Sequence, residues 1–286
     1  EAVPMNYYQN AVIYITGGSS GIGYAVAEEV LSKGARVVLF ARDKKKLATA
    51  QRDLSRNETE RGERIGIFPL DVSDQKNTMK TIPLAVKKYG GPSLLINCAG
   101  IAASVPFDST EYDLFKSMLD INVLGTRNMN YAVLPFMKQN GGTIVNVASL
   151  AGLIGVYGYS AYGASKFAII GLSESMRLEL KRQGIRVKVV CPPEVDTPMV
   201  REEAKTILPV AKRLKVLGGV MTAEEAAHYI IRKIPGRGFL IIPGVMARIT
   251  CSLTRHFPRF SRWTMDMMLA LFEKRGSNKP AYSKNK

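Results

Sequence analysis

A tyrosine and a lysine stand four residues apart in the stretch YGASK, as Tyr162 and Lys166. If this stretch is helical, both side chains leave the same face of the helix, one turn apart. Taken alone, such a pair is most often a polar pair on a solvated surface. It becomes a candidate catalytic pair if other reactive groups of the chain can be brought beside it.

Ser149 is such a group, because it ends the apolar segment GGTIVNVAS, which we expect to be a buried strand. Ligands of open α/β sheets bind at the carboxyl edge of the strands, so Ser149 can meet the tyrosine and the lysine there. A free phenol has a pKa near ~10. We expect the Lys166 ammonium and an oxidised nicotinamide to lower the pKa of Tyr162, which then serves as general acid or base during hydride transfer. Ser149 would stabilise the charge that develops on the substrate oxygen.

A glycine-rich segment, TGGSSGIG from Thr16 to Gly23, lies between the first apolar segment and the first helical pattern. Its glycines follow the spacing G-x-x-x-G-x-G. Glycines let a backbone turn tightly and approach a pyrophosphate, which then sits on the amino end of the following helix. The alternative is a glycine-rich turn without a ligand, but its place after a first buried strand favours a phosphate loop.

The end of the second apolar segment, LFARD, indicates which dinucleotide would bind. An acidic residue there would hold a ribose 2′-hydroxyl, whereas an arginine accommodates a 2′-phosphate. Ala41 occupies the acidic position, Arg42 follows it, and Lys46 lies one helical turn further on. This favours NADP(H) over NAD(H), although a register shift of two residues would put Asp43 in the acidic position.

Apolar, β-branched segments alternate with helical patterns over most of the chain. This alternation predicts an α/β fold, with a single Rossmann-type doubly wound parallel sheet covered by helices on both faces. We expect Pro83 to kink the third helix or set its start, and the helical region 110–139 to be interrupted near Gly125. We place the catalytic domain at residues 1–244, with a substrate lid at about 196–220, and a basic amphipathic extension at 245–286.

The 286-residue chain carries a formal charge of +16, which favours an anionic partner such as a phosphorylated cofactor, an acidic membrane or a nucleic acid. No recognition motif and no interleaving of aromatic with basic residues supports nucleic-acid binding. The chain has three cysteines without C-x-x-C spacing and two histidines, which argues against a zinc site and against a Ser-His-Asp triad. We therefore expect no metal site, a reducing compartment and a location on the cytoplasmic side.

These motifs together resemble the short-chain dehydrogenase/reductase family over about Val12 to Gly244. The segments LDV, NCAG and DINVLG are similar to its adenine contact, its fourth-strand motif and its proton-relay asparagine, here Asn122. The resemblance implies that Asn122, Ser149, Tyr162 and Lys166 are catalytic, and that Lys166 also holds the nicotinamide ribose. Pro192-Pro193 stands where many members have Pro-Gly, which leaves the local loop geometry open. The implied cofactor contacts are Gly17, Ser19, Ser20, Gly21, Ile22, Gly23, Arg42, Lys46, Asp71, Val72, Asn97, Ala99, Tyr162, Lys166, Pro192, Val195 and Thr197.

Within this family, GGSSGIG, FARDKKKL, AYGASKFAI and PPEVDTP look most like the 3-ketodihydrosphingosine reductases, which use NADPH on a long-chain ketone at a membrane. Steroid, retinoid and 3-oxoacyl reductases share much of this pattern and remain alternatives. An NADPH-binding regulator or scaffold without activity is the alternative from another class. The intact catalytic set argues against it. Family members usually pair through long helices, so we expect a homodimer involving the regions 110–139 and 160–183.

The C-terminal segment has no window of 18 uncharged residues, so we expect no membrane-spanning helix there. Residues 232–286 hold twelve Lys or Arg against two acids, a net charge of 12 − 2 = +10. This pattern suits a helix lying in a membrane interface. A helix packed on the domain or on a dimer partner is the equal alternative. The apolar residues at helical spacing are Phe260, Trp263, Met267 and Leu271, and the flanking basic residues are Arg259, Arg262, Lys274 and Arg275.

Overall fold

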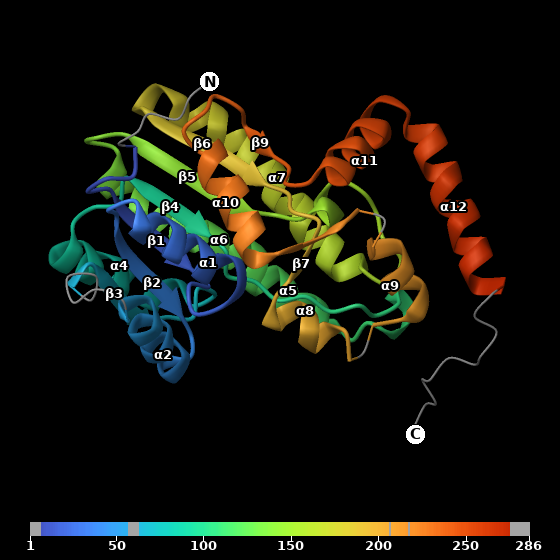
Figure 1. Cartoon of the computed structure of the whole chain (residues 1–286), viewed down its shortest axis with the longest axis horizontal. Helices are drawn as coiled ribbons and strands as arrows, with labels where there is room; N and C mark the ends of the chain where they lie inside the picture. Colours follow the sequence, from blue (N-terminus) through green and yellow to red (C-terminus); the bar gives the residue numbers. More distant parts are fainter. Residues whose placement is uncertain (1–6, 57–62, 206, 217, 275–286) are drawn as a thin grey trace.

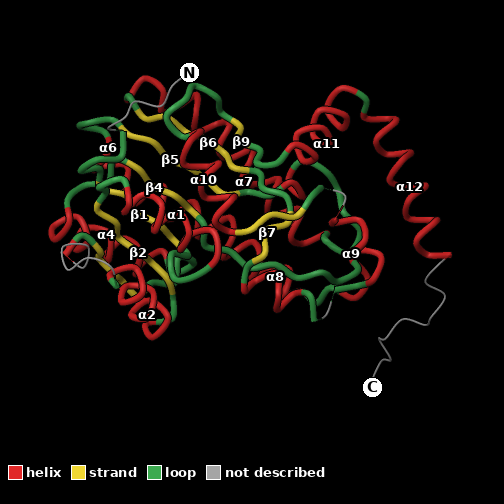
Figure 2. The backbone as a smooth tube through the Cα atoms, viewed as in Figure 1, coloured by secondary structure: helices red, strands yellow, loops and turns green. Residues whose placement is uncertain are grey.

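Seven parallel strands form the central sheet of the computed structural model, in the order β3-β2-β1-β4-β5-β6-β9, with helices on both faces (Figures 1 and 2). The predicted doubly wound α/β fold is therefore confirmed. The structure describes residues 7–56, 63–205, 207–216 and 218–274. The strands are β1 (Val12–Thr16), β2 (Arg36–Ala41), β3 (Ile65–Pro69), β4 (Leu94–Asn97), β5 (Gly142–Val147), β6 (Ile185–Val190) and β9 (Leu240–Ile241).

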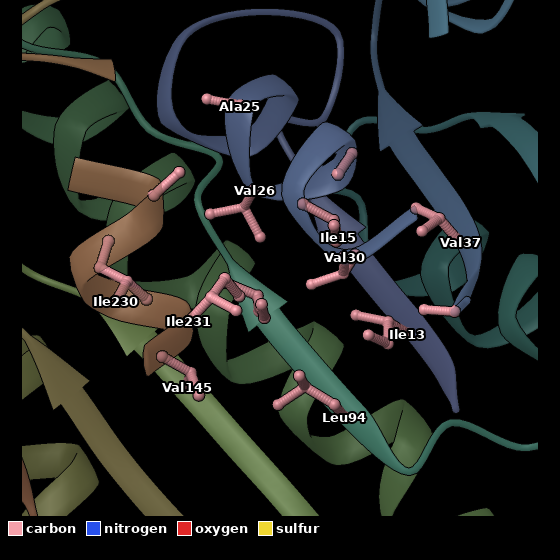
Figure 3. Packing of buried hydrophobic residues seen from close by; sticks show 14 of the residues in the cluster. Ile13, Ile15, Ala25, Val26, Val30, Val37, Leu94, Val145, Ile230 and Ile231 are labelled. Atoms are coloured by element: carbon pink, nitrogen blue, oxygen red, sulfur yellow. The ribbon is translucent and has the colours of Figure 1, made fainter. Parts of the chain in front are cut away.

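Alternate residues of each strand point to opposite faces of the sheet and enter two separate cores. Ile13 and Ile15 of β1 pack with helices α1 and α10 on one face, as Figure 3 shows. Tyr14, between them, belongs to the core under α4, α6 and α7 on the other face. The helices are α1 (Gly21–Ser32), α2 (Lys44–Ser55), α4 (Gln75–Tyr89), α5 (Tyr112–Met118), α6 (Gly125–Met137), α7 (Ser160–Leu180) and α10 (Ala223–Lys233).

Two local expectations about the helices have different outcomes. The α4 helix begins at Gln75, and the Asp74 side chain caps it by accepting a hydrogen bond from the Asn77 N–H. Pro83 therefore lies inside the helix and does not set its start. The predicted interruption near Gly125 is present as a wider π-helical turn over Leu119–Leu124. That turn carries Asn122 into the interior, where its side chain is fully buried.

The remaining elements gather at the carboxyl end of the sheet, on the side away from α2 (Figure 1). A small two-stranded sheet, β7 (Glu194–Asp196) with β8 (Val220–Thr222), brackets two short helices, α8 (Pro198–Glu203) and α9 (Pro209–Val216). The C-terminal segment forms two helices, α11 (Val245–His256) and α12 (Pro258–Lys274), because Pro258 starts a new helix. Arg275 lies outside the described residues. Among the described helices, none is long and apolar enough to cross a membrane.

Candidate active site

The structure brings Ser149, Tyr162 and Lys166 together at the carboxyl end of β5. Lys166 is buried on α7, and its ammonium donates a hydrogen bond to the carbonyl oxygen of Val147 at 3.0 Å. The same nitrogen lies 5.5 Å from the centre of the Tyr162 ring. Ser149 follows β5, and its hydroxyl accepts a hydrogen bond from the Ala151 N–H at 3.1 Å. One strand end and the first turns of one helix therefore position all three groups.

Burial shifts the pKa values of both Tyr162 and Lys166, and the shift of Tyr162 is opposite to the one expected. Burial raises the pKa of Tyr162 to about 12, against a lowering by its hydrogen bond with Ser149. Burial also lowers the pKa of Lys166 to about 8. The expectation that Tyr162 has a lowered pKa is thus wrong for the chain alone, because desolvation of the phenolate outweighs the nearby hydrogen bond.

Asn122 connects the loop after β4 to helix α7. Its Oδ1 accepts a hydrogen bond from the Ile101 N–H at 2.8 Å. Its Nδ2 donates to the Ile101 carbonyl oxygen at 3.0 Å and to the Ser165 hydroxyl at 2.9 Å. A Cβ added to Gly100 would lie 3.0 Å from Asn122 Oδ1 and 3.7 Å from Lys166 Nζ. Asn122 and Lys166 therefore both approach Gly100, but the Asn122 side chain does not line the cavity.

The glycine loop between β1 and α1 has the close backbone contacts that a phosphate cradle requires. A Cβ on Gly23 would lie 2.6 Å from the Gly17 carbonyl oxygen, and one on Gly17 would lie 2.9 Å from the Ala99 nitrogen. Gly17 and Gly21 also have positive φ angles, of 66° and 56°. Only glycine meets both demands without strain. The loop leaves the amino end of α1 open to the cavity, and it fits the pyrophosphate of a dinucleotide.

The end of β2 shows how Ala41, Arg42 and Asp43 are placed relative to the cavity. Ala41 is the last residue of the strand. The Asp43 carboxylate caps α2 by accepting hydrogen bonds from the Lys45 and Lys46 N–H groups at 2.8 and 3.0 Å, and this bonding lowers its pKa. Arg42 and Lys46 line the same end of the cavity. Asp43 also lines the cavity, but its carboxylate is engaged in the helix cap, so Arg42 and Lys46 are the cationic side chains that could hold a 2′-phosphate here.

The residues after β3 and β4 divide into cavity-lining and buried positions. Asp71 accepts hydrogen bonds from the Ser73 N–H at 2.9 Å and the Ser73 hydroxyl at 2.6 Å. Asn97 instead donates its side-chain N–H groups to Asn130 at 2.7 Å and Asn146 at 2.9 Å, in a buried polar network. The Asn97 side chain is therefore directed into the core and does not line the cavity.

The segment after β6 closes the cavity against the glycine loop. The Pro192 carbonyl oxygen accepts a hydrogen bond from the Leu150 N–H at 2.9 Å. Thr197 caps α8, and its methyl group would lie 3.0 Å from a Cβ on Gly21. Val195, in β7, is buried. The two consecutive prolines thus still bring Val195 and Thr197 to the cavity.

A single cavity of about 590 Å³ joins these regions. With the exceptions of Asn97 and Asn122, every residue that the sequence predicts for the site lines it. Among the lining residues that the sequence did not predict, four on the substrate side are titratable and no local motif marks them: Tyr159, Glu194, Glu203 and Lys215. Sequence reasoning also assigned the tail no role in the cavity, which is lined by Met246, Thr250, Leu253, Thr254, Met265 and Met268.

A phosphate loop at one end of a cavity and a tyrosine–lysine pair further along it define a dinucleotide-dependent oxidoreductase of the Rossmann type. Residues 11–207 match the family model described as short chain dehydrogenase, and the chain belongs to this family.

Two relatives and one solved structure show where the chain lies within it. It is 35% identical over 250 residues to a 3-dehydrosphinganine reductase of Danio rerio, covering 85% of this chain and 75% of that protein. It is 36% identical over 224 residues to a 3-ketodihydrosphingosine reductase of Mus musculus, covering 78% of this chain and 68% of that protein. A short chain dehydrogenase of Burkholderia cenocepacia, solved in complex with NADP, superposes with a TM-score of 0.75 at 25% identity, over 90% of this chain and 98% of that one.

Proposed function

We propose that the protein is an NADPH-dependent reductase that converts 3-ketodihydrosphingosine to dihydrosphingosine. The observation that carries this proposal is the continuity of the cavity. It runs from the glycine loop past Ser149, Tyr162 and Lys166 to a part lined by apolar side chains, including Leu214, Leu253 and Met268. A polar cofactor and an alkyl chain both have a suitable surface there. The names of the similar reductases and the family membership support the same reaction.

The chain fits NADPH through three features. The glycine loop and the amino end of α1 would hold the pyrophosphate, and Arg42 with Lys46 would hold the 2′-phosphate. When bound, NADPH supplies the hydride that adds to the carbonyl carbon. Lys166 gives one N–H to Val147 and has two more to offer to ribose hydroxyls, because an ammonium carries three donors.

Tyr162 and Ser149 act on the carbonyl oxygen. Because the pKa of Tyr162 lies near 12, the phenol keeps its proton at neutral pH and can deliver it to the oxygen as negative charge builds up. The Ser149 hydroxyl donates a hydrogen bond to the same oxygen. In the reverse reaction the phenolate must form first, and a positively charged nicotinamide ring would favour it.

Turnover of a ketone panel tests the function. The loss of NADPH absorbance would be followed with 3-ketodihydrosphingosine, a 3-ketosteroid, retinal and a 3-oxoacyl thioester, with NADH as the cofactor control. We expect fast turnover of the sphingoid ketone with NADPH. Turnover of another ketone alone would keep the mechanism and refute the substrate. Tight NADPH binding without turnover of any ketone would favour the regulatory alternative.

We also propose that α11 and α12 contact an anionic membrane surface. Four apolar side chains on α12 are about half exposed: Phe260, Trp263, Met267 and Leu271. Phe260 also lines the cavity, but about half of each of these side chains is left open to the surroundings. Arg259 and Arg262 are exposed on the same helix and can attract lipid phosphates. This location would place the apolar part of the cavity near a lipid phase.

Vesicle flotation tests the membrane contact. The variant Trp263→Ser/Met267→Ser should bind vesicles of anionic phospholipid less than the wild type does. Leu84→Ser, which removes an equally exposed apolar side chain from α4, should bind like the wild type. Equal recovery of all three proteins away from the vesicles would refute the contact.

A homodimer through α6 and α7 is the third part of the proposal. Exposed apolar side chains lie on both regions, at Leu124, Tyr131, Phe167 and Leu178. Burying them against a second copy would remove apolar surface from water. Light scattering should give the mass of a dimer for the wild type, and Leu178→Glu should shift it towards the monomer. A monomeric wild type would refute this part.

A further inference from the structure

A partly buried ion cluster lies on the substrate side of the cavity, formed by Glu194, Glu203 and Lys215. The Lys215 ammonium is 2.8 Å from Glu203 Oε2 and 3.5 Å from Glu194 Oε2. The Glu203 side chain is only 2% exposed. The three residues come from β7, α8 and α9, which lie together at the carboxyl end of the sheet (Figure 1). The cluster is therefore assembled by the segment expected to cover the substrate.

The cluster is connected to the catalytic tyrosine through Tyr159. Lys215 Nζ lies 5.6 Å from the centre of the Tyr159 ring, and that ring meets the Tyr162 ring edge to face with centres 5.8 Å apart. Tyr159 is buried and, like all members of the cluster, lines the cavity. Burial is the largest cause of the raised pKa of Tyr162, and the hydrogen bond with Ser149 opposes it. The negative charge of Glu203 raises this pKa further. The charge of Glu203 thus acts at the reacting end of the cavity.

The three side chains together carry a net negative charge, because two carboxylates share one ammonium. Negative charge in a desolvated site favours a ligand that brings a compensating cation. We propose that Glu203, assisted by Glu194, recognises the ammonium group of a 2-amino-3-ketone substrate. The inference rests on the proposed function, whose substrate carries an amine on the carbon next to the carbonyl.

This recognition would serve both binding and chemistry. An ammonium next to the reacting carbonyl must lie close to Tyr162, which is the side of the cavity that the cluster occupies. The positive charge of the ammonium would offset the negative charge of Glu203. It would also stabilise the negative charge that develops on the carbonyl oxygen. Lys215 would position both carboxylates from α9. The competing explanation is a structural clamp that only holds α8 and α9 together.

Substrate discrimination in matched variants separates the two explanations. The substrates are a long-chain 2-amino-3-ketone and the 3-ketone of the same length that lacks the amine. Glu203→Gln should raise KM for the amino ketone about ten- to a hundredfold, the usual loss for a charge-assisted contact. KM for the neutral ketone should change by less than about twofold, since it has no cation to lose. Glu202→Gln is the control, because Glu202 lies on the same helix and pairs with the exposed Lys205.

An equal rise in KM for both ketones would establish a clamp and overturn the inference. An unchanged KM for both ketones would also overturn it. If Glu203→Gln does not fold, the wild type still decides. It should prefer the amino ketone, and Glu194→Gln should reduce that preference. If the wild type reduces both ketones equally well, the ammonium site is overturned but the proposed function stands. A wild type that reduces only neutral ketones refutes the proposed function and, with it, the ammonium site.

Discussion

The ammonium of Lys166 donates a hydrogen bond to the main-chain carbonyl oxygen of Val147, 3.0 Å away, and so joins α7 to the end of β5. The contact is buried, and burial lowers the pKa of Lys166 to about 8. With a pKa of about 8, Lys166 changes its protonation state within the pH range in which unfolding can be measured. Its protonation therefore couples the catalytic helix to the stability of the fold.

The first prediction concerns that coupling. Between pH 8 and the unfolded value of 10.5, the unfolded chain binds more protons at Lys166 than the folded chain does, so this group makes stability rise with pH. The wild type should therefore gain stability relative to Lys166→Met across this range, by up to about 3 kcal/mol. Urea unfolding at several pH values measures the difference. A constant difference would mean that Lys166 has an ordinary pKa in the folded protein.

The second prediction concerns the proton donor. Tyr162→Phe should lower kcat for ketone reduction by about 10²–10⁴-fold, because the hydroxyl that delivers the proton is removed. NADPH affinity, measured by the quenching of protein fluorescence, should stay within about threefold, because the ring itself remains in place. Tyr157→Phe is the control, since Tyr157 is 40% exposed and does not line the cavity. Undiminished activity of Tyr162→Phe would exclude Tyr162 as the acid.

The third prediction concerns cofactor preference. Arg42→Ala should raise KM for NADPH about ten- to a hundredfold, because a guanidinium–phosphate contact is lost. KM for NADH, which lacks the 2′-phosphate, should change little. Lys45→Ala removes a neighbouring charge that does not line the cavity, and it should leave both values unchanged. Parallel losses with the two cofactors would place Arg42 away from the 2′-phosphate.

The fourth prediction compares two glycines in helices. Gly23→Ala places a methyl group 2.6 Å from the Gly17 carbonyl oxygen, so it should destabilise the protein by about 1–3 kcal/mol and weaken NADPH binding. A Cβ on Gly171 meets nothing within 4 Å, so Gly171→Ala should stabilise α7 by about 0.5–1 kcal/mol. Thermal unfolding with and without NADPH measures both effects. Similar behaviour of the two variants would contradict the tight packing of the loop.

The fifth prediction separates two roles for Asn97. Its side chain bonds to Asn130 and Asn146 in the core. Asn97→Ala should therefore lower the free energy of unfolding by about 1–3 kcal/mol, since buried partners lose their hydrogen bonds. NADPH affinity of the folded fraction should be kept. A loss of affinity without a loss of stability would support the cofactor contact that the family resemblance implies.

Local sequence patterns were sufficient for much of the fold and part of the site. The alternation of β-branched segments with helical patterns predicts the parallel sheet, because parallel strands must be covered on both faces. The glycine spacing before α1 and the four-residue spacing of Tyr162 and Lys166 are short-range features. A turn or one helical repeat sets their geometry, so no distant residue is needed to predict them.

Other features depend on groups that only folding brings together. Desolvation by the surrounding chain decides that the pKa of Tyr162 is raised rather than lowered. The direction of the Asn97 side chain depends on Asn130 and Asn146, which belong to other elements.

The substrate side of the cavity was likewise decided by tertiary structure. Glu203 and Lys215 lie twelve residues apart on separate helices, and no periodicity relates them. The sequence by itself therefore determined the sheet, the cofactor loop and the catalytic pair, because neighbouring residues build them. Tertiary structure alone decided the electrostatics and the substrate side, because charge, burial and contact there depend on residues distant in the chain.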